Sequence, residues 1–250
     1  MKKYLLVLLN LCACNYLFAQ KVEISIQAYS GLFHYAGNGS ASTTDIAQSG
    51  PPVHDYTTNP YGNKNGFSYG TGLQAQRVSK NGFIVGLGVN YEILRSKVTI
   101  NNFNPGFFYA SAQLYGYGPV VSQVNGSAFL QDQSINLSPY IGYRLKFKKT
   151  SIDLLPGIDI DLNLSSYDKG EATVTYLSPA SGVHRANNKR PDAPADVRLK
   201  FGGALNYKRL AFTASYAHGL INYNKDMPGD FNVHSELIRF GIAYKLFYVH

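Results

Sequence analysis

The sequence predicts an all-β fold, a transmembrane up-and-down antiparallel β-barrel of eight strands. Eight segments alternate apolar with polar residues, as strands do when their two faces meet different surroundings. Long polar connections alternate with short basic turns along the chain, which is the loop pattern of an up-and-down barrel. A segment with the features of an export signal precedes the first of these strands.

The N-terminal segment has the three parts of a secretory signal peptide. Lys2 and Lys3 make a basic start, an apolar run follows, and Ala19 precedes a plausible cleavage point. The apolar run is interrupted by Asn10 and is shorter than the roughly 20 residues that a membrane-spanning helix needs. We therefore expect residues 1–19 to be a cleaved signal peptide.

The cysteines also lie in this segment. Cys12 and Cys14 lie before the expected cleavage point, and a lipoprotein signal that lipidates Cys14 is the alternative. Cleavage after Ala19 leaves residues 20–250 as the barrel domain, without any cysteine. A disulfide framework and a cysteine-based metal or redox site are then excluded.

Each of the eight alternating segments predicts one strand. In chain order they are about Lys21 to Phe33, about Phe67 to Val78, Phe83 to about Ile93, about Gln133 to Phe147, Ile152 to Leu164, about Val197 to Tyr207, Leu210 to about Tyr216, and Ile238 to Phe247. Within each, residues at positions i and i+2 share a face.

The first three strands differ in regularity. Apolar residues alternate over 22–28 in the first strand. In the second strand, Leu73 and Ala75 lie on the face opposite a set of glycines and glutamines. The third is the most regular, with six alternate apolar residues over 83–93. Asn81-Gly82 joins the second and third, and this dipeptide favours a hairpin because both residues tolerate positive φ.

The next strands follow the same pattern. Six alternate apolar residues over 133–147 make the fourth strand, and Lys148-Lys149 begins the turn into the fifth. Pro156 lies on the apolar face of the fifth strand, which requires a bulge or a locally broken ladder. Lys208-Arg209 turns the sixth strand into the seventh.

Four long connections join these hairpins. They cover about 36–65, 101–127, 165–195 and 222–234, and they are rich in Gly, Ser, Asn and Pro. We expect them to be loops at one end of the barrel. A ten-stranded wall is the alternative, because Phe107 to Leu114 and Val120 to Phe129 could form a further hairpin.

The polar faces of the strands carry matched charges. By alternation they hold the acids Glu23, Glu92, Asp153, Asp159 and Asp161, and the bases Arg144, Arg198, Lys200, Arg239 and Lys245. Equal numbers of acids and bases suit a closed lumen in which each ion needs a partner. A soluble barrel with its apolar face inward shows the same alternation, so it remains the alternative.

Aromatic residues favour lipid on the apolar face. Phe83, Phe147, Tyr207 and Phe212 fall near the short turns, and Tyr91 lies toward the long connections. Such belts occur where a wall crosses two membrane interfaces.

Several features together resemble a known family. They are the signal ending in Phe18-Ala19-Gln20, the eight amphipathic strands, and the aromatic residues Phe240, Tyr244 and Phe247 of the last strand. In these the chain resembles the small outer-membrane β-barrel proteins of Bacteroidetes, including PorT-like proteins, and more distantly the OmpA and OmpX barrels. The resemblance covers the whole mature chain and implies insertion by the barrel-assembly machinery. It also implies a part in type IX secretion.

Charge and composition bear on partners. Removal of Lys2 and Lys3 lowers the count of Lys plus Arg from 23 to 21 against 15 Asp plus Glu, a net charge of +6. The cations are scattered over turns, loops and one strand face, so we expect no nucleic-acid partner. Anionic outer-membrane lipid and lipopolysaccharide are the expected counter-charge, with a periplasmic or secretion-system partner as a further possibility.

An eight-stranded barrel is just wide enough to be filled by its own side chains. The charges therefore predict a salt-bridged plug and a non-enzymatic protein without cofactors, whose long loops serve structure, binding or secretion. A narrow ion path is one alternative. A lipid-modifying enzyme is another, with His218 as its candidate residue, although Leu220 stands where a lipid A deacylase has a serine. The six histidines have no metal-ligand spacing.

Overall fold

The computed structural model describes residues 21–49, 53–106, 120–177, 181–190, 195–225 and 229–249. The expected signal peptide with its cleavage after Ala19, both cysteines and the segment 107–114 lie outside the described residues. The strands are β1 (Lys21–Ala36), β2 (Thr43–Gln48), β3 (Asp55–Thr57), β4 (Lys64–Val78), β5 (Phe83–Asn104), β6 (Val121–Lys146), β7 (Thr150–Tyr176), β8 (Ser181–Arg190), β9 (Asp196–Tyr207), β10 (Leu210–Gly219) and β11 (His234–Val249). Within the described ranges, no helix is both long and apolar enough to cross a membrane.

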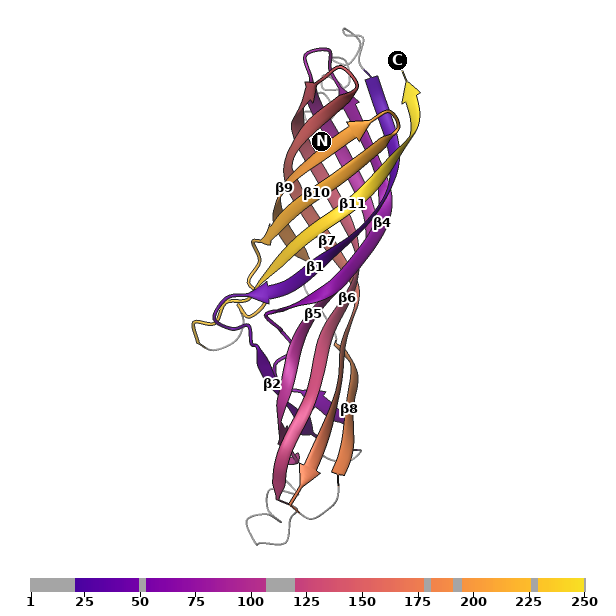
Figure 1. Cartoon of the computed structure of the whole chain (residues 1–250). Coiled ribbons are helices and arrows are strands. Elements are labelled where there is room, and N and C mark those ends of the chain that lie inside the picture. Colours follow the sequence, from indigo (N-terminus) through magenta and orange to yellow (C-terminus); the bar gives the residue numbers. More distant parts are fainter. Residues whose placement is uncertain are drawn as a thin grey trace.

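Eight of these strands close into one barrel, here called the main barrel. Its order is β1-β4-β5-β6-β7-β9-β10-β11, and the pairing of β11 with β1 closes the ring. Every neighbouring pair in it is antiparallel. The predicted fold class is therefore confirmed, with eight strands in the wall rather than ten. The short turns lie together at one end, the upper end in Figure 1.

A second ring of strands continues from the opposite end. The strands β5, β6 and β7 run on past the main barrel, and their far parts join β2, β3 and β8 into a ring of six strands within the described residues. On β7 the neighbour changes from β9 to β8 between Asp161 and Ser166. Figure 1 shows this outer ring, comprising β2, β3, β8 and residues 99–104, 121–130 and 166–176, as a narrow extension.

The outer ring corrects three predicted loops. The expected loop over 36–65 contains β2 and β3, and the one over 165–195 contains the end of β7 and all of β8. The connection over 101–127 is shortened at both ends, so the proposed hairpin strand 120–129 is the far part of β6. Large apolar residues are few in these segments, and small residues such as Ala128, Ala172 and Ala186 take several of the inward positions. Their periodicity is therefore weak.

An apolar core fills the outer ring. It consists of Ile46, Val98, Ile100, Phe103, Ala128, Ala172, Val174 and Ala186, all buried. Several are small, which lets the strands approach one another in a tight ring. Phe103, which lies within the expected loop over 101–127, is one of these core residues.

Gly82, Pro156 and Gly86 account for three local features of the wall. Gly82 has φ of 95°, so the Asn-Gly turn uses positive φ at its glycine. The pairing of β6 with β7 is interrupted beside Pro156. Tyr140 pairs with Gly157, and the next residues to pair are Tyr143 and Leu154. Gly86 faces the ring of Tyr140, and a Cβ at this position would overlap that ring. Glycine in this strand therefore makes room for a large inward side chain.

Asp168 of β7 holds β3 in the outer ring through two hydrogen bonds. Its Oδ2 accepts hydrogen bonds from the Thr57 backbone N–H (3.1 Å) and from the Thr57 hydroxyl (2.8 Å). Burial raises the pKa of Asp168 above its ordinary value, although both Thr57 donors lower it. We expect Asp168→Ala to destabilise this contact by about 1–3 kcal/mol, because the buried Thr57 donors lose their acceptor.

Amide hydrogen exchange at Thr57 measures this loss. Asp168→Asn keeps an acceptor oxygen and serves as the control, with a smaller increase in exchange expected. Equal increases in the two variants would contradict the role of the acceptor.

Candidate functional site

The structure places all ten predicted charges inside the main barrel. Nine are buried, and the side chain of Lys200 is 15% exposed. They form three clusters along the lumen, which we call the inner, central and outer clusters, the inner one lying at the end with the short turns. The barrel wall alone separates them from the apolar exterior.

The inner cluster is centred on Arg144. Its guanidinium donates to both oxygens of Asp153 at 2.7 Å and to both oxygens of Glu23 at 2.9 and 3.0 Å. Lys245 lies 3.1 Å from Glu23, and Asn206 donates to Asp153 at 2.9 Å. Bidentate contacts of this kind are the strongest form of ion pair.

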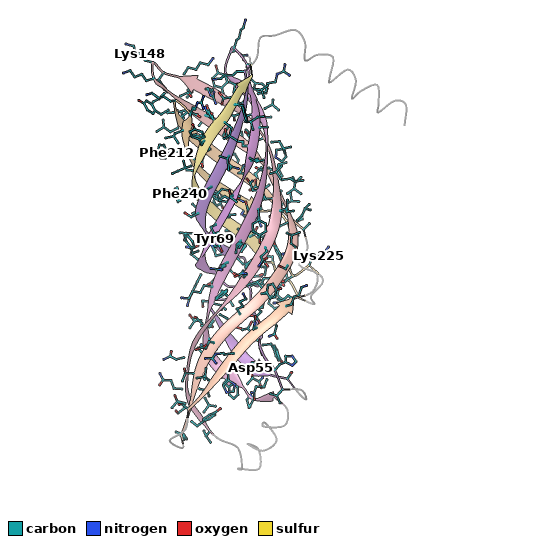
Figure 2. All side chains as sticks on the ribbon, turned by 90° about the vertical axis from the view of Figure 1, so that its right-hand side faces the viewer. Asp55, Tyr69, Lys148, Phe212, Lys225 and Phe240 are labelled. Atoms are coloured by element: carbon teal, nitrogen blue, oxygen red, sulfur yellow. The ribbon has the colours of Figure 1, made fainter. Side chains whose placement is uncertain are left out.

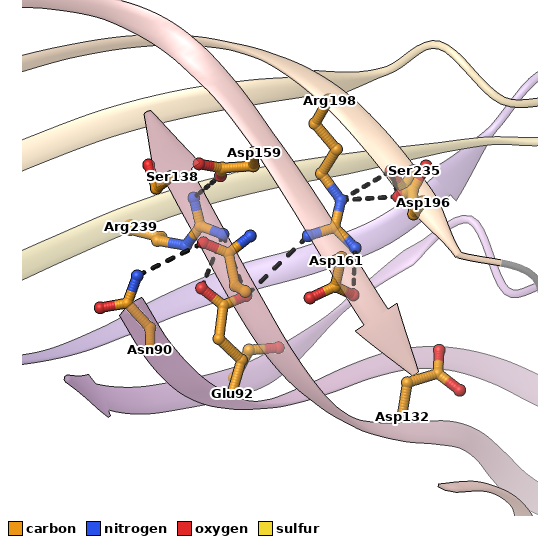
Figure 3. Close-up of polar contacts among 12 residues, drawn as sticks. Asn90, Glu92, Asp132, Ser138, Asp159, Asp161, Asp196, Arg198, Ser235 and Arg239 are labelled. Atoms are coloured by element: carbon orange, nitrogen blue, oxygen red, sulfur yellow. Dashed lines mark hydrogen bonds and ion pairs between the residues drawn. The ribbon is translucent and has the colours of Figure 1, made fainter. Parts of the chain in front are cut away.

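The central cluster is centred on Arg239 and Glu92 (Figure 3). Arg239 donates to Glu92 at 2.8 and 3.0 Å and to Asp159 at 2.6 Å. Lys200 lies 3.3 Å from the other oxygen of Asp159. The hydroxyl of Tyr29 donates to Glu92 at 2.6 Å, so the cluster joins residues from five strands.

The outer cluster is centred on Arg198, whose side chain is 1% exposed. It donates to Asp196 at 2.7 Å, to Asp161 at 3.1 Å and to the Ser235 hydroxyl at 3.0 Å. Arg198 also lies 3.9 Å from Glu92, which links this cluster to the central one, as Figure 3 shows.

Sequence reasoning missed two acids of this lumen. Asp196 shares the inward parity of Arg198 and Lys200, but the sixth strand was expected to begin one residue later. Asp132 faces inward on β6, one residue before the predicted start of the fourth strand. It accepts a hydrogen bond from the Tyr35 hydroxyl at 2.9 Å. Extending the alternation by one or two residues at each strand end would have found both.

An aromatic lid covers the outer cluster. Tyr35 packs edge-on against Phe33, Tyr61 and Tyr223, with ring centres 5.0–5.2 Å apart. The Arg198 guanidinium lies 5.8 Å from the centre of the Phe33 ring, so the lid lies directly on the ions. Buried leucine and valine side chains complete it. This layer fills the main barrel where the outer ring begins.

The space left in the middle of the lumen is small. A polar cavity of about 80 Å³ lies between the inner and central clusters, beside Gln27, Asn90 and Ser138. It has room for a few water molecules. Along the lumen the order is therefore inner cluster, polar cavity, central cluster, outer cluster and aromatic lid.

His218 lies on the outside of the wall. Its Nδ1 is 2.6 Å from Glu236, and its ring lies 6.1 Å from that of His234. Leu220 is exposed beside this pair. In the described part of the chain, no serine is hydrogen-bonded to His218, and no group of three His, Cys, Asp or Glu is arranged to hold a metal ion.

The exterior of the main barrel is an apolar belt. Outward residues at mid-wall, such as Val89 and its partner Leu73, are exposed, and so are the aromatic residues near both ends, among them Phe83, Tyr207 and Tyr91. Figure 2 shows Phe212, Phe240 and Tyr69 on this outer surface. Buried ions inside and exposed apolar side chains outside invert the usual arrangement of a soluble protein.

Solved structures of similar architecture are bacterial barrels. Neisserial surface protein A is 10% identical, covers 89% of this chain and 97% of its own, and has a TM-score of 0.34. Ail of Yersinia pestis is 12% identical, with 92% and 100% coverage and a TM-score of 0.30. The NalP translocator domain of Neisseria meningitidis is 9% identical, with 98% and 95% coverage and a TM-score of 0.26.

The chain is similar to outer-membrane β-barrel proteins. No protein-family model and no curated protein matches the sequence.

Proposed function

We propose that the protein is an integral outer-membrane barrel without enzymatic activity, in which a salt-bridged plug stabilises the lumen and the outer ring stands above the membrane as a rigid platform for binding. The observation that carries this proposal is the apolar belt, because exposed apolar residues cover the main barrel while its ions face inward. The expected orientation puts the short turns in the periplasm and the outer ring outside the cell.

A charged residue in the belt tests the membrane placement. We expect Val89→Arg to lower the free energy of unfolding by about 2–4 kcal/mol, because Val89 would meet hydrocarbon at mid-membrane. Guanidinium unfolding in phosphatidylcholine vesicles measures this loss. Asn101→Arg is the matched control, since Asn101 is an exposed residue of the same strand in the outer ring. Equal costs for the two substitutions would favour the soluble barrel instead.

Cations just beyond the belt support lipopolysaccharide as a partner. Arg95, Lys97, Lys169 and Lys189 face outward on neighbouring strands, where the apolar residues end and the outer ring begins. Arg95 is held at 5.6–5.8 Å from the rings of Tyr69 and Phe129. Lipid phosphates at the outer interface would meet these cations.

The plug is our proposal for the lumen, in preference to an ion path. Its support is the succession of ion clusters and aromatic lid along the lumen, with a cavity of about 80 Å³ between the inner and central clusters. Insertion by the barrel-assembly machinery would use the last strand, whose outward Phe240 and Phe247 are exposed. A PorT-like part in secretion is the narrower proposal, supported by the pattern of strands and signal; secretion-system genes beside this one would favour it.

A further inference from the structure

The end of the main barrel with the short turns opens into a basic recess. It has a volume of about 620 Å³, within the range of about 300–1,000 Å³ that is usual for ligand pockets. Eight cationic side chains and one carboxylate, that of Glu23, line it among the described residues. This surplus of seven positive charges exceeds the net charge of +6 of residues 20–250.

The floor and the rim of this recess differ. At the floor, Arg144 is paired with Glu23 and Asp153 and Lys245 is paired with Glu23, so two carboxylates neutralise these two cations. The rim is formed by turn residues, including Lys80, Lys148 and Lys149, and no carboxylate lies among the described residues lining it. Because the charges of the rim are all positive, their electric field is concentrated in the recess and attracts an anion into it.

The position of the cations decides whether a phospholipid phosphate or a peptide carboxylate can reach them more easily. Lys21, Lys146 and Lys245 occupy inward positions of their strands, while outward residues at the same end, such as Phe83 and Tyr207, are apolar or aromatic. Phospholipid phosphates lie around the outside of the wall and would have to leave the bilayer interface to reach the recess. An extended polypeptide can enter it from the aqueous side.

We propose that this recess binds an acidic segment of a periplasmic protein, whose Asp and Glu side chains meet the rim lysines. The inference rests on the proposed function, which places this end in the periplasm. Binding is electrostatic and therefore falls with ionic strength. The neutral floor closes the recess below the bound segment and separates it from the rest of the lumen.

The test uses fluorescein-labelled octaglutamate and the refolded protein in uncharged detergent micelles. We expect saturable binding by fluorescence anisotropy at about 25 mM salt, with most of it lost at about 500 mM. Lys80→Gln/Lys148→Gln/Lys149→Gln should weaken binding at least about tenfold. The matched control is Lys64→Gln/Arg185→Gln/Lys225→Gln, which removes the same charge from exposed residues at the outer end and should change affinity less than about twofold.

Three results would overturn the inference. They are absence of octaglutamate binding at low salt, equal losses in the two triple variants, and binding of phosphatidylglycerol vesicles through the rim lysines without any binding of the peptide. Each sample is also run unheated on a denaturing gel, where a folded barrel migrates faster than the heated chain. Failure to bind by a fast-migrating barrel refutes this inference alone, whereas absence of the fast form refutes the proposed function and the inference with it.

Discussion

Replacing Arg198 with methionine is expected to lower the free energy of unfolding by about 3–5 kcal/mol, the usual cost of leaving a buried charge without its partner. Asp161 and Asp196 are directly paired across β7 and β9, and the Arg198 guanidinium donates to both. Methionine fills similar space but leaves two carboxylates side by side without this cation. The expected loss of stability comes from the two unpaired carboxylates rather than from the change in side-chain volume.

A triple variant separates charge from packing. In Arg198→Met/Asp161→Asn/Asp196→Asn no uncompensated carboxylate remains at this cluster, so we expect most of the lost stability to return. Unfolding in phosphatidylcholine vesicles is followed by far-UV circular dichroism, because the chain has no Trp for fluorescence. Equal and small losses in the single and triple variants would contradict a salt-bridged plug, and an equal, large loss would assign the effect to packing.

Truncating Ile100 to alanine should cost about 2–5 kcal/mol, and this loss should be confined to the outer ring. Ile100 is fully buried in the outer-ring core against residues such as Ile46 and Val98. That core is small, and the aromatic lid separates it from the ion clusters, so a cavity there has few other contacts to compensate for it. We expect the ring to open while the main barrel stays folded.

Limited proteolysis measures this opening. Ile100→Ala should be cleaved faster than the parent protein in the segments of β2 and β8, with the fast-migrating form on an unheated gel retained. Asn101→Ala changes the next residue, which is exposed, and should be cleaved at the parent rate. Unchanged resistance of Ile100→Ala would contradict a separately stabilised ring, as would loss of the fast-migrating form in parallel with cleavage.

The wall of the main barrel was predictable because its signal is local. Along β5, residues two apart share a face, so Val89 and Tyr91 are outward and Asn90 and Glu92 inward, without knowledge of any neighbouring strand. The short turns could be located from residues such as Gly82. The inward position of each of the ten charges follows from the same parity.

The outer ring was not predictable in this way. The strand β2 pairs in parallel with β5, and β3 pairs with β8 from more than a hundred residues away. Its outward positions are mostly polar, and its inward positions mix large apolar residues such as Ile100 with small ones such as Ala128 and Ala172. A segment such as 43–48 therefore has the composition of a loop, and only closure with β5, β6 and β7 makes it a strand.

The partners of the charges also required the tertiary structure. Arg144 and Glu23 are 121 residues apart, and Arg239 and Glu92 are 147 apart. Parity shows that such residues enter the lumen, but the stagger between strands decides which ions lie at the same height.

By itself, the sequence determined which residues share a face in each of the eight wall strands and which ten charged residues lie on the polar faces, because these depend on a period of two within single strands. The closure of the wall at eight strands and the outward direction of its apolar face came only with the pairing of the strands. The tertiary structure alone decided the division into three clusters, the aromatic lid, the outer ring and the basic recess. These depend on register between distant strands, which no single segment encodes.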